Sequence, residues 1–315
     1  MSRTLSATTV GVIFAYLLLT LHFSWALQPM SSLRQRLLSG AKSYGPVCMS
    51  DSPVVMELLA LTGYGHMIID HEHSPTHSSS GQALLQAIDA ARFSSRNGQQ
   101  QQHHITEPII RVPDDDPTYM KKVLDSMRLP AGVLVPMVEN AETARKVVAA
   151  TRYPLQLSDG PGSIDGIRGC AVPFVRASGY GQNLDYMKHC QEDLLVMVQV
   201  ETEKGVEAIA EIASVPGVDG VFLGPFDLSC SIGKVAQFED AQVKELIRTA
   251  EQSVLETDCF LAGFKSGGRD LKRMFDDGYS LVCGSIDLGL LKEAARQDVE
   301  SFENISGYGT ESNSF

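Results

Sequence analysis

Eight short apolar stretches alternate with eight stretches of helical pattern between residues 44 and 303, and this alternation restricts the fold more than any other feature. We expect strands at about 44–50, 66–72, 107–112, 132–138, 194–200, 218–224, 259–264 and 279–285. Helices are expected near 53–62, 80–93, 117–128, 139–151, 203–214, 238–255, 267–277 and 287–303. This strand and helix count predicts an α/β protein with a (β/α)8 TIM barrel. A doubly wound sheet is the alternative, but no nucleotide-binding fingerprint supports it.

The stretch Leu194–Leu228 shows one strand–helix–strand unit in full. An apolar run over 194–200 predicts a buried strand, and a second strand ends at about Gly224. Glu201 and Asp227 follow these two strands. Because active sites of parallel α/β folds lie at the carboxyl ends of the strands, we expect the two carboxylates to converge there. Such a pair, completed by water and substrate oxygens, suits Mg²⁺ or Mn²⁺. The alternative is that Glu201 caps a helix and Asp227 closes an Asx turn.

Composition excludes several classes of protein. The 315 residues carry a formal net charge of −12 with no block of Lys or Arg, which argues against nucleic-acid binding. Hydrophobic residues at 43% and charged residues at 20% are typical of a soluble globular protein. Six cysteines lie far apart without CxxC spacing, so we expect reduced thiols rather than a zinc cage or a disulfide framework.

The first 50 residues contain no Asp or Glu. Arg3, the apolar run 10–21 and the small residues Ser24 and Ala26 have the layout of a secretory signal peptide over 1–26, with an uncleaved anchor as the alternative. Residues 27–42 are predicted to be either a transit segment or, over 33–38, the first helix of the folded domain. A signal peptide joined to a transit segment implies a plastid of secondary origin. The endomembrane system is the other destination, where the sequon at Asn304 would matter.

The remaining boundaries follow from composition. We expect the barrel domain to span 43–303, without stable membrane association after processing, and a flexible tail over 304–315. The polar connection at 93–107, rich in Gln and His, predicts a surface loop, and the Gly- and Asp-rich connection at 155–169 is typical of an active-site lid.

Polar residues gather at the expected carboxyl ends of the strands: Asp70, His71, Glu72, His73, Arg111, Gln199, Glu201, Asp227 and Lys265. His71 and His73 alternate in the strand pattern, so this tract is an alternative zinc site, although no third ligand is evident. Lys265 ends an apolar strand and is a candidate Schiff-base lysine. The Ser-Gly-Gly that follows it indicates a solvated turn, which disfavours that role.

Seven segments between about residues 33 and 302 resemble the HpcH/HpaI family of class II, metal-dependent pyruvate aldolases, which includes 4-hydroxy-2-oxoheptanedioate aldolase and 2-keto-3-deoxy sugar-acid aldolases. The segments, in the family's order, are IIDHEHSP, PIIRVPDDDP, LVPMVENAETARKVVAATRYP, GIRG, VRAS, VQVETEKG and GVDGVFLGPFDLS. The resemblance implies a TIM barrel in which Glu201 and Asp227 bind Mg²⁺, Mn²⁺ or Co²⁺.

The resemblance also implies roles for the other polar residues. His73 would be the catalytic base, and Asp125 would raise its basicity. Arg111 would stabilise developing negative charge, and Gln199 with the backbone of Phe226 and Asp227 would hold the substrate. A neutral imidazole can move a proton near pH 7, and a fixed guanidinium can stabilise an oxyanion, so these residue types suit those roles.

The implied reaction is reversible cleavage of a 4-hydroxy-2-oxo acid to pyruvate and an aldehyde through a metal-stabilised enolate. The partners would be these small molecules and further copies of the chain, with a homohexamer expected from the family. His71 stands where a glycine is usual, and the loops at 97–104 and 155–166 are longer than in bacterial members. These departures concern substrate choice more than the core chemistry. The alternatives are an acyl-CoA lyase of the citrate lyase β type and a non-catalytic barrel that serves as a binding protein.

Overall fold

The computed structural model describes residues 31–97, 106–154, 165–266 and 268–306. The predicted signal peptide over 1–26, residues 98–105 of the predicted surface loop, residues 155–164 of the predicted lid and residues 307–315 of the predicted tail lie outside these ranges. The predicted start of the surface loop at Phe93 is wrong, because a helix continues to Asn97. From Leu33 onward, the described residues form one compact unit. No helix within the described ranges has the length and apolar character needed to cross a membrane.

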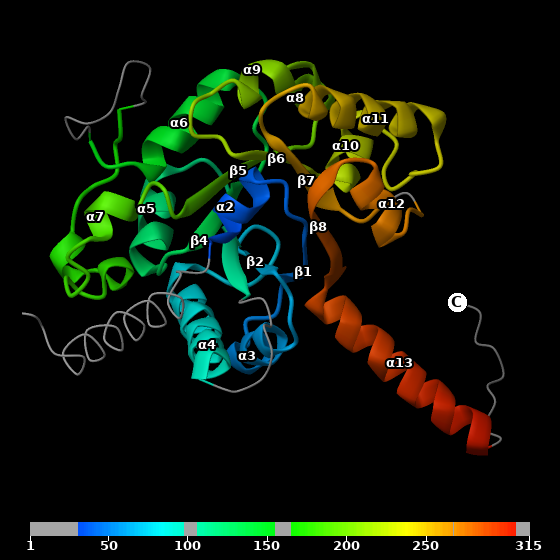
Figure 1. Ribbon diagram of the computed structural model, residues 1–315. Helices are drawn as coiled ribbons and strands as arrows, with labels where there is room; N and C mark the ends of the chain where they lie inside the picture. The colour runs from blue at the N-terminus through cyan, green and yellow to red at the C-terminus, as the bar shows by residue number, and fades with distance from the viewer. Residues whose placement is uncertain (1–30, 98–105, 155–164, 267, 307–315) are drawn as a thin grey trace, which may run out of the picture. The chain divides into compact units, whose positions relative to one another are not determined.

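Eight parallel strands close into a barrel in which each strand pairs with the next along the chain, and β8 pairs with β1 (Figure 1). The strands are β1 (Ser43–Cys48), β2 (His66–Asp70), β3 (Glu107–Arg111), β4 (Ala131–Val135), β5 (Leu194–Val200), β6 (Gly220–Leu223), β7 (Phe260–Phe264) and β8 (Tyr279–Ile286). The predicted (β/α)8 barrel is confirmed, because helices lie between successive strands.

The long helices match the predicted stretches within a few residues: α3 (Pro53–Leu61), α4 (Ser78–Asn97), α5 (Pro117–Ser126), α6 (Ala141–Thr151), α11 (Ala241–Leu255), α12 (Leu271–Asp276) and α13 (Asp287–Ser306). The single helix expected over 203–214 is instead two short helices, α8 (Glu203–Glu207) and α9 (Ile209–Ala213). Short elements that were not predicted are η1 (Val172–Phe174), η2 (Arg176–Ser178), α7 (Tyr186–His189) and α10 (Pro225–Ser231).

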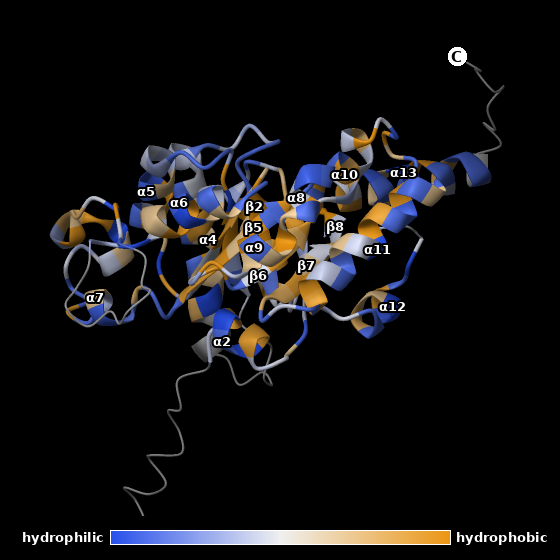
Figure 2. Ribbon diagram, turned by 90° about the horizontal axis from the view of Figure 1, so that it is seen from above, coloured by the Kyte–Doolittle hydropathy of each residue, from blue (hydrophilic) through white to orange (hydrophobic). Residues whose placement is uncertain are grey.

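The period of two along each strand separates the inside of the barrel from the layer beneath the helices. In β2, Ile68 belongs to the cluster that fills the barrel, whereas Met67 and Ile69 belong to the outer cluster. Figure 2 shows the strands coloured mainly as hydrophobic, with hydrophilic faces on the surrounding helices. When this alternation is extended to the carboxyl end of β2, Asp70 is on the inward side and His71 on the outward side.

The helix α2 (Leu33–Leu38) packs into the cluster that fills the barrel through Leu33 and Leu37. Arg34 pairs with Asp219, which precedes β6, at 2.8 Å, and Glu107 at the start of β3 accepts the backbone N–H of Leu33 at 2.8 Å. Because Asp219 and Glu107 lie at the amino ends of their strands, α2 covers that end of the barrel. Residues 33–38 are therefore a helix of the folded unit.

Candidate active site

Asp70 and Arg111 form a buried ion pair at the carboxyl ends of the adjacent strands β2 and β3. Arg111 donates from Nε and Nη2 to the two carboxylate oxygens of Asp70 at 2.9 and 2.7 Å. Burial by itself would raise the pKa of Asp70, but the hydrogen bonds and charge of Arg111 hold that pKa below its ordinary value. This two-point contact fixes the plane of the guanidinium and leaves Nη1 for a further anionic partner.

Glu72 is that further partner. Its Oε2 lies 3.2 Å from Nη1 of Arg111, a contact that has ion-pair distance but not hydrogen-bond geometry. Partial burial raises the pKa of Glu72, with the charges of Asp70 and Asp227 acting in the same direction and Arg111 opposing them. The exposed His73 places Nε2 of its ring 3.7 Å from Oε1 of Glu72.

Asp125 lies on α5, where its carboxylate accepts a hydrogen bond from Nη2 of Arg168 at 2.8 Å. Within the described chain, the carboxylate in contact with the His73 ring is Glu72. The role of Asp125 in raising the basicity of His73 therefore stays a prediction, while its ion pair with Arg168 is a contact that sequence reasoning missed.

Glu201 follows β5 and is 2% exposed. Its Oε1 accepts the backbone N–H of Met137 at 2.8 Å, and its Oε2 accepts the side-chain amide of Gln199. Met137 adopts φ of 55°, a left-handed conformation that is uncommon for a non-glycine residue. Strained backbone of this kind persists where the surroundings over-determine it, often at functional sites. The left-handed conformation of Met137 directs its backbone N–H at the carboxylate of Glu201.

Gly224 makes room for this carboxylate. A Cβ at that position would lie 2.6 Å from Oε2 of Glu201 and 3.2 Å from Nε2 of Gln199. Only glycine lets the backbone between β6 and α10 pass so close to the two side chains. The following Pro225 occupies the first turn of α10, a position that proline favours, and brings Asp227 into the same turn. Asp227 therefore stands at the start of a short helix, not in an isolated turn.

The carboxylates of this region influence one another. Burial is the largest cause that raises the pKa of Glu201 to about 7, and the charges of Glu72 and Asp227 act in the same direction, against the hydrogen bonds from Gln199 and Met137. Burial would lower the pKa of Arg111, but its hydrogen bonds to Asp70 and the nearby carboxylates, Glu201 among them, raise that pKa instead. A cation bound beside a buried carboxylate would offset the repulsion from the neighbouring negative charges.

The donor set fits a hard divalent cation at Glu201 and Asp227, with water and substrate oxygens as further ligands. Gln199 adds an unsatisfied acceptor beside it, because its buried Oε1 has no hydrogen-bond partner among the described residues. In the same ranges, no group of three or more His, Cys, Asp or Glu side chains is arranged to hold a metal by protein ligands alone.

Two alternatives from the sequence are disfavoured by the positions of their residues. His71 is buried against Tyr119, and burial lowers the pKa of its imidazole to about 4, whereas His73 is exposed beside Glu72. The two rings therefore do not share one face, as a zinc site would require. Lys265 is exposed after the end of β7, which is not the apolar setting that activates a Schiff-base lysine.

Phe226 is 57% exposed at the mouth of the barrel, and its ring packs edge-on against Phe238 with centroids 4.9 Å apart. The first N–H groups of a helix lack partners within that helix, so the backbone of Phe226 and Asp227 is oriented to donate hydrogen bonds. Their predicted role in holding substrate stays a prediction.

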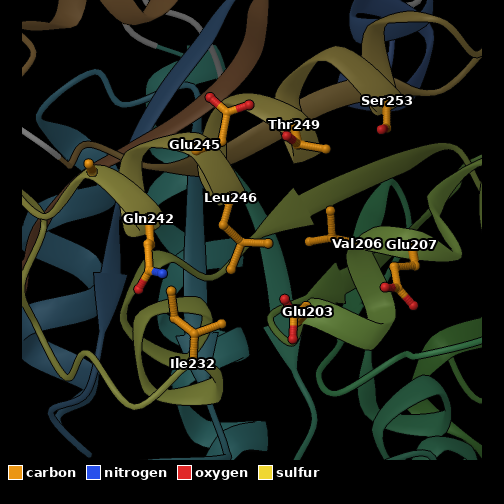
Figure 3. Close-up of a pocket in the computed structure, with 10 residues that line it drawn as sticks. Glu203, Val206, Glu207, Ile232, Gln242, Glu245, Leu246, Thr249 and Ser253 are labelled. Atoms are coloured by element: carbon orange, nitrogen blue, oxygen red, sulfur yellow. The ribbon is translucent and has the colours of Figure 1, made fainter.

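A separate pocket of about 840 Å³ lies between α8 and α11 (Figure 3). Its lining combines glutamates with apolar and neutral polar side chains: Glu203, Val206, Glu207, Ile232, Ala241, Gln242, Glu245, Leu246, Thr249 and Ser253. None of the predicted site residues lines this pocket.

Comparison with known proteins identifies the family of this chain. The HpcH/HpaI aldolase/citrate lyase family model matches residues 47–294. This chain belongs to the HpcH/HpaI aldolase/citrate lyase family. A hydroxypyruvate/pyruvate aldolase of Roseovarius nubinhibens is 33% identical to it over 279 residues, covering 85% of this chain and 95% of that protein.

A second relative and a solved structure also match most of this chain. A 4-hydroxy-2-oxo-heptane-1,7-dioate aldolase of Shigella flexneri is 32% identical over 276 residues, covering 88% of this chain and 94% of that protein. The crystal structure of an HpcH/HpaI aldolase/citrate lyase family protein from Burkholderia cenocepacia superposes with a TM-score of 0.76 at 32% identity. The match covers 86% of this chain and 98% of that structure, so the similarity extends over the barrel as a whole.

Proposed function

We propose that this protein is a divalent-metal-dependent pyruvate aldolase that reversibly cleaves a 4-hydroxy-2-oxo acid to pyruvate and an aldehyde. Membership of the family and the aldolase names of its relatives support the reaction class. The observation that carries the metal requirement is the position of Glu201, buried at the carboxyl end of β5 and held by Met137 and Gln199, with Asp227 following the adjacent strand β6.

Glu201 and Asp227 would hold the cation, which supplies Lewis-acid stabilisation to the oxygens of a 2-oxo acid. Arg111 keeps its guanidinium at the same edge of the barrel through its two hydrogen bonds to Asp70. A preorganised cation at this place stabilises an oxyanion as it forms, because it needs no reorientation during the reaction.

His73 is the residue that moves the proton. Its exposed ring is accessible to substrate and lies beside Glu72, whose carboxylate can stabilise the imidazolium once it forms. In cleavage, the imidazole accepts the proton of the 4-hydroxyl group as the bond between C3 and C4 breaks. The electron pair of that bond forms the enolate of pyruvate, the aldehyde departs, and the proton is returned to C3.

Gln199 and Phe226 contribute to substrate binding in this proposal. The amide of Gln199 fixes one oxygen of Glu201, and its own buried Oε1 has no hydrogen-bond partner among the described residues, so this acceptor is available to a ligand. The exposed Phe226 ring, held by Phe238, offers an apolar wall beside Asp227. A homohexamer is expected from the family, and light scattering on the purified protein measures it.

The direct test is pyruvate release from a panel of 4-hydroxy-2-oxo acids, measured in chelator and after addition of Mg²⁺, Mn²⁺ or Co²⁺. We expect no release in chelator and recovery on addition of metal. An acyl-CoA ester is included as a competing substrate. Turnover of that ester alone, or equal release of pyruvate in chelator, would reject the proposed function.

A further inference from the structure

His71 lies immediately before Glu72 and His73 but faces the opposite way. His71 is 5% exposed, and its ring lies against Tyr119 of α5 and Gly81 of α4, two helices outside the barrel. Its Nδ1 is 3.0 Å from the hydroxyl of Tyr119 on α5, and the two rings meet edge to face at 87°. The backbone N–H of His71 continues the pairing with β3 by donating to the carbonyl of Arg111 at 2.9 Å.

The Tyr119 hydroxyl also lies near the start of α4. The backbone of Ser78 acts to lower the pKa of that hydroxyl, although burial, the larger cause, raises the pKa overall. The Tyr119 hydroxyl and Nδ1 of His71 share one hydrogen bond, whose donor depends on the tautomer of the imidazole. Tyr119 thus ties the end of β2 to α5.

Gly81 fits against the other edge of the same ring. A Cβ at that position would lie 2.7 Å from both Cε1 and Nε2 of His71, closer than real Cβ atoms approach. Glycine weakens a helix because it loses more conformational freedom than other residues on folding. Its presence in α4 is explained by the volume of the His71 ring.

We propose that His71 is a positioning residue for the aldol reaction, whose ring, wedged between Tyr119 and Gly81, holds Glu72 and His73 at the barrel mouth. This inference rests on the proposed function of His73. A glycine at position 71 would make neither the hydrogen bond with Tyr119 nor the contact with Gly81. His71, Tyr119 and Gly81 form one unit, which we call the β2 clamp.

Apart from the β2 clamp, the turn after β2 is attached to the barrel through Glu72, whose N–H donates to Oδ1 of Asp70 at 3.0 Å and whose Oε2 lies 3.2 Å from Nη1 of Arg111. Ser74 donates to the carbonyl of Asp70 and accepts the N–H of Thr76, so these contacts shape the turn without attaching it to a helix. Asp70 is already fixed by Arg111. Because His71 lies between this fixed carboxylate and the exposed His73, loss of the β2 clamp moves His73 without releasing Arg111.

The test is a double-mutant cycle with a matched control. Gly81→Ala should lower kcat at least about tenfold with KM for the oxo acid changed less than about threefold, because the metal and Arg111 still bind substrate. In the His71→Gly background the same Gly81→Ala change should have no further effect, since the ring that it clashes with is gone. Gly289→Ala is the control, because a Cβ there meets only Ile286 at 3.9 Å, and it should leave kcat unchanged.

A conservative variant separates positioning from simple stability. His71→Asn places an amide oxygen near the position of Nδ1, keeps the acceptor for Tyr119, and should retain more of kcat than His71→Gly. Hydrogen exchange of the 71–77 backbone, followed by mass spectrometry, should be faster in Gly81→Ala and normal in Gly289→Ala. This readout needs no substrate, so it tests the β2 clamp even if the proposed reaction is wrong. The inference would be overturned if the effects of Gly81→Ala and His71→Gly on kcat multiplied in the double variant. It would also be overturned if Gly81→Ala lowered Tm and left kcat unchanged.

Discussion

Glu201→Gln is the substitution whose effect on stability can be worked out most directly from the structure. Burial and neighbouring carboxylates raise the pKa of Glu201 from an ordinary 4.5 to about 7. A native state with the higher pKa binds the proton more tightly than the unfolded chain. The corresponding stabilisation is complete below about pH 4.5 and is lost as the pH rises through about 7. Glutamine can keep the oxygen that accepts from Met137 and removes the charge. Its NH2 group then replaces the oxygen that accepts from Gln199, so the Gln199 amide must turn to offer its unpaired Oε1 instead.

The size of the effect follows from the difference between these two pKa values. At about 1.4 kcal/mol per pH unit, the gap between 4.5 and about 7 corresponds to about 3 kcal/mol of unfavourable free energy above pH 7. In the metal-free protein, Glu201→Gln should therefore raise the free energy of unfolding by up to about 3 kcal/mol at about pH 8. At about pH 4.5 the variant and the wild type should differ little, because Glu201 is then mostly protonated when folded.

The assay is urea unfolding in EDTA at about pH 4.5, 6 and 8, with Glu203→Gln as the matched control. Glu203 is exposed two residues further along the chain, so its loss should change stability little at any of these pH values. Addition of excess Mn²⁺ at the highest pH should stabilise the wild type and not Glu201→Gln, which reverses their order. A variant that is less stable than the wild type at that pH in EDTA would refute the reasoning.

Three further predictions concern the other residues. His73→Ala should lower kcat by about 10²–10⁴-fold with little change in KM, because it removes the proton acceptor. It should also slow the exchange of the pyruvate methyl protons with solvent, which NMR measures. Exchange at the wild-type rate would exclude His73 as the base. Arg111→Lys should have a lower kcat/KM than the wild type although it keeps the positive charge. An ammonium group cannot replace both of the hydrogen bonds that Arg111 makes to Asp70, at 2.9 and 2.7 Å. A kcat/KM equal to the wild-type value would show that charge alone suffices. The free energy of unfolding, measured in urea, should be at least about 3 kcal/mol lower for a chain that begins at Ser39 than for one that begins at Ser31, because Leu33 and Leu37 fill the amino end of the barrel. Equal free energies of unfolding would contradict that role. We also propose that residues 1–50 direct export from the cytosol, which a fluorescent fusion tests and uniform cytosolic fluorescence would contradict.

The barrel could be predicted from the sequence because each strand is a short apolar run that a break or a helix follows. The break of one predicted helix into α8 and α9 at Ala208 was not visible, because the apolar stripe continues across it. The short helix α10, which Pro225 begins, was not predicted either. In both cases the backbone conformation depends on packing that composition does not encode.

The site could be predicted only in part for a related reason. The alternation of β2 identifies Asp70 as inward-facing, and strand pairing places it opposite Arg111. The left-handed Met137 and its hydrogen bond to Glu201 depend on a loop conformation without a sequence signal. The ion pair of Asp125 with Arg168 joins α5 to a distant loop, a long-range contact that periodicity does not reveal. Glu72 was visible in the sequence, but its place between Arg111 and His73 was not.

Exchange of the pyruvate methyl protons with solvent, followed by NMR with and without EDTA, tests the central claim most directly, because it reports enolate formation without requiring the correct aldehyde. We predict exchange that stops in EDTA, returns with Mn²⁺, and is absent in Asp227→Ala under both conditions, with no adduct at Lys265 after borohydride treatment. Unchanged exchange in EDTA, together with a pyruvate adduct on Lys265, would contradict a metal site at Glu201 and Asp227.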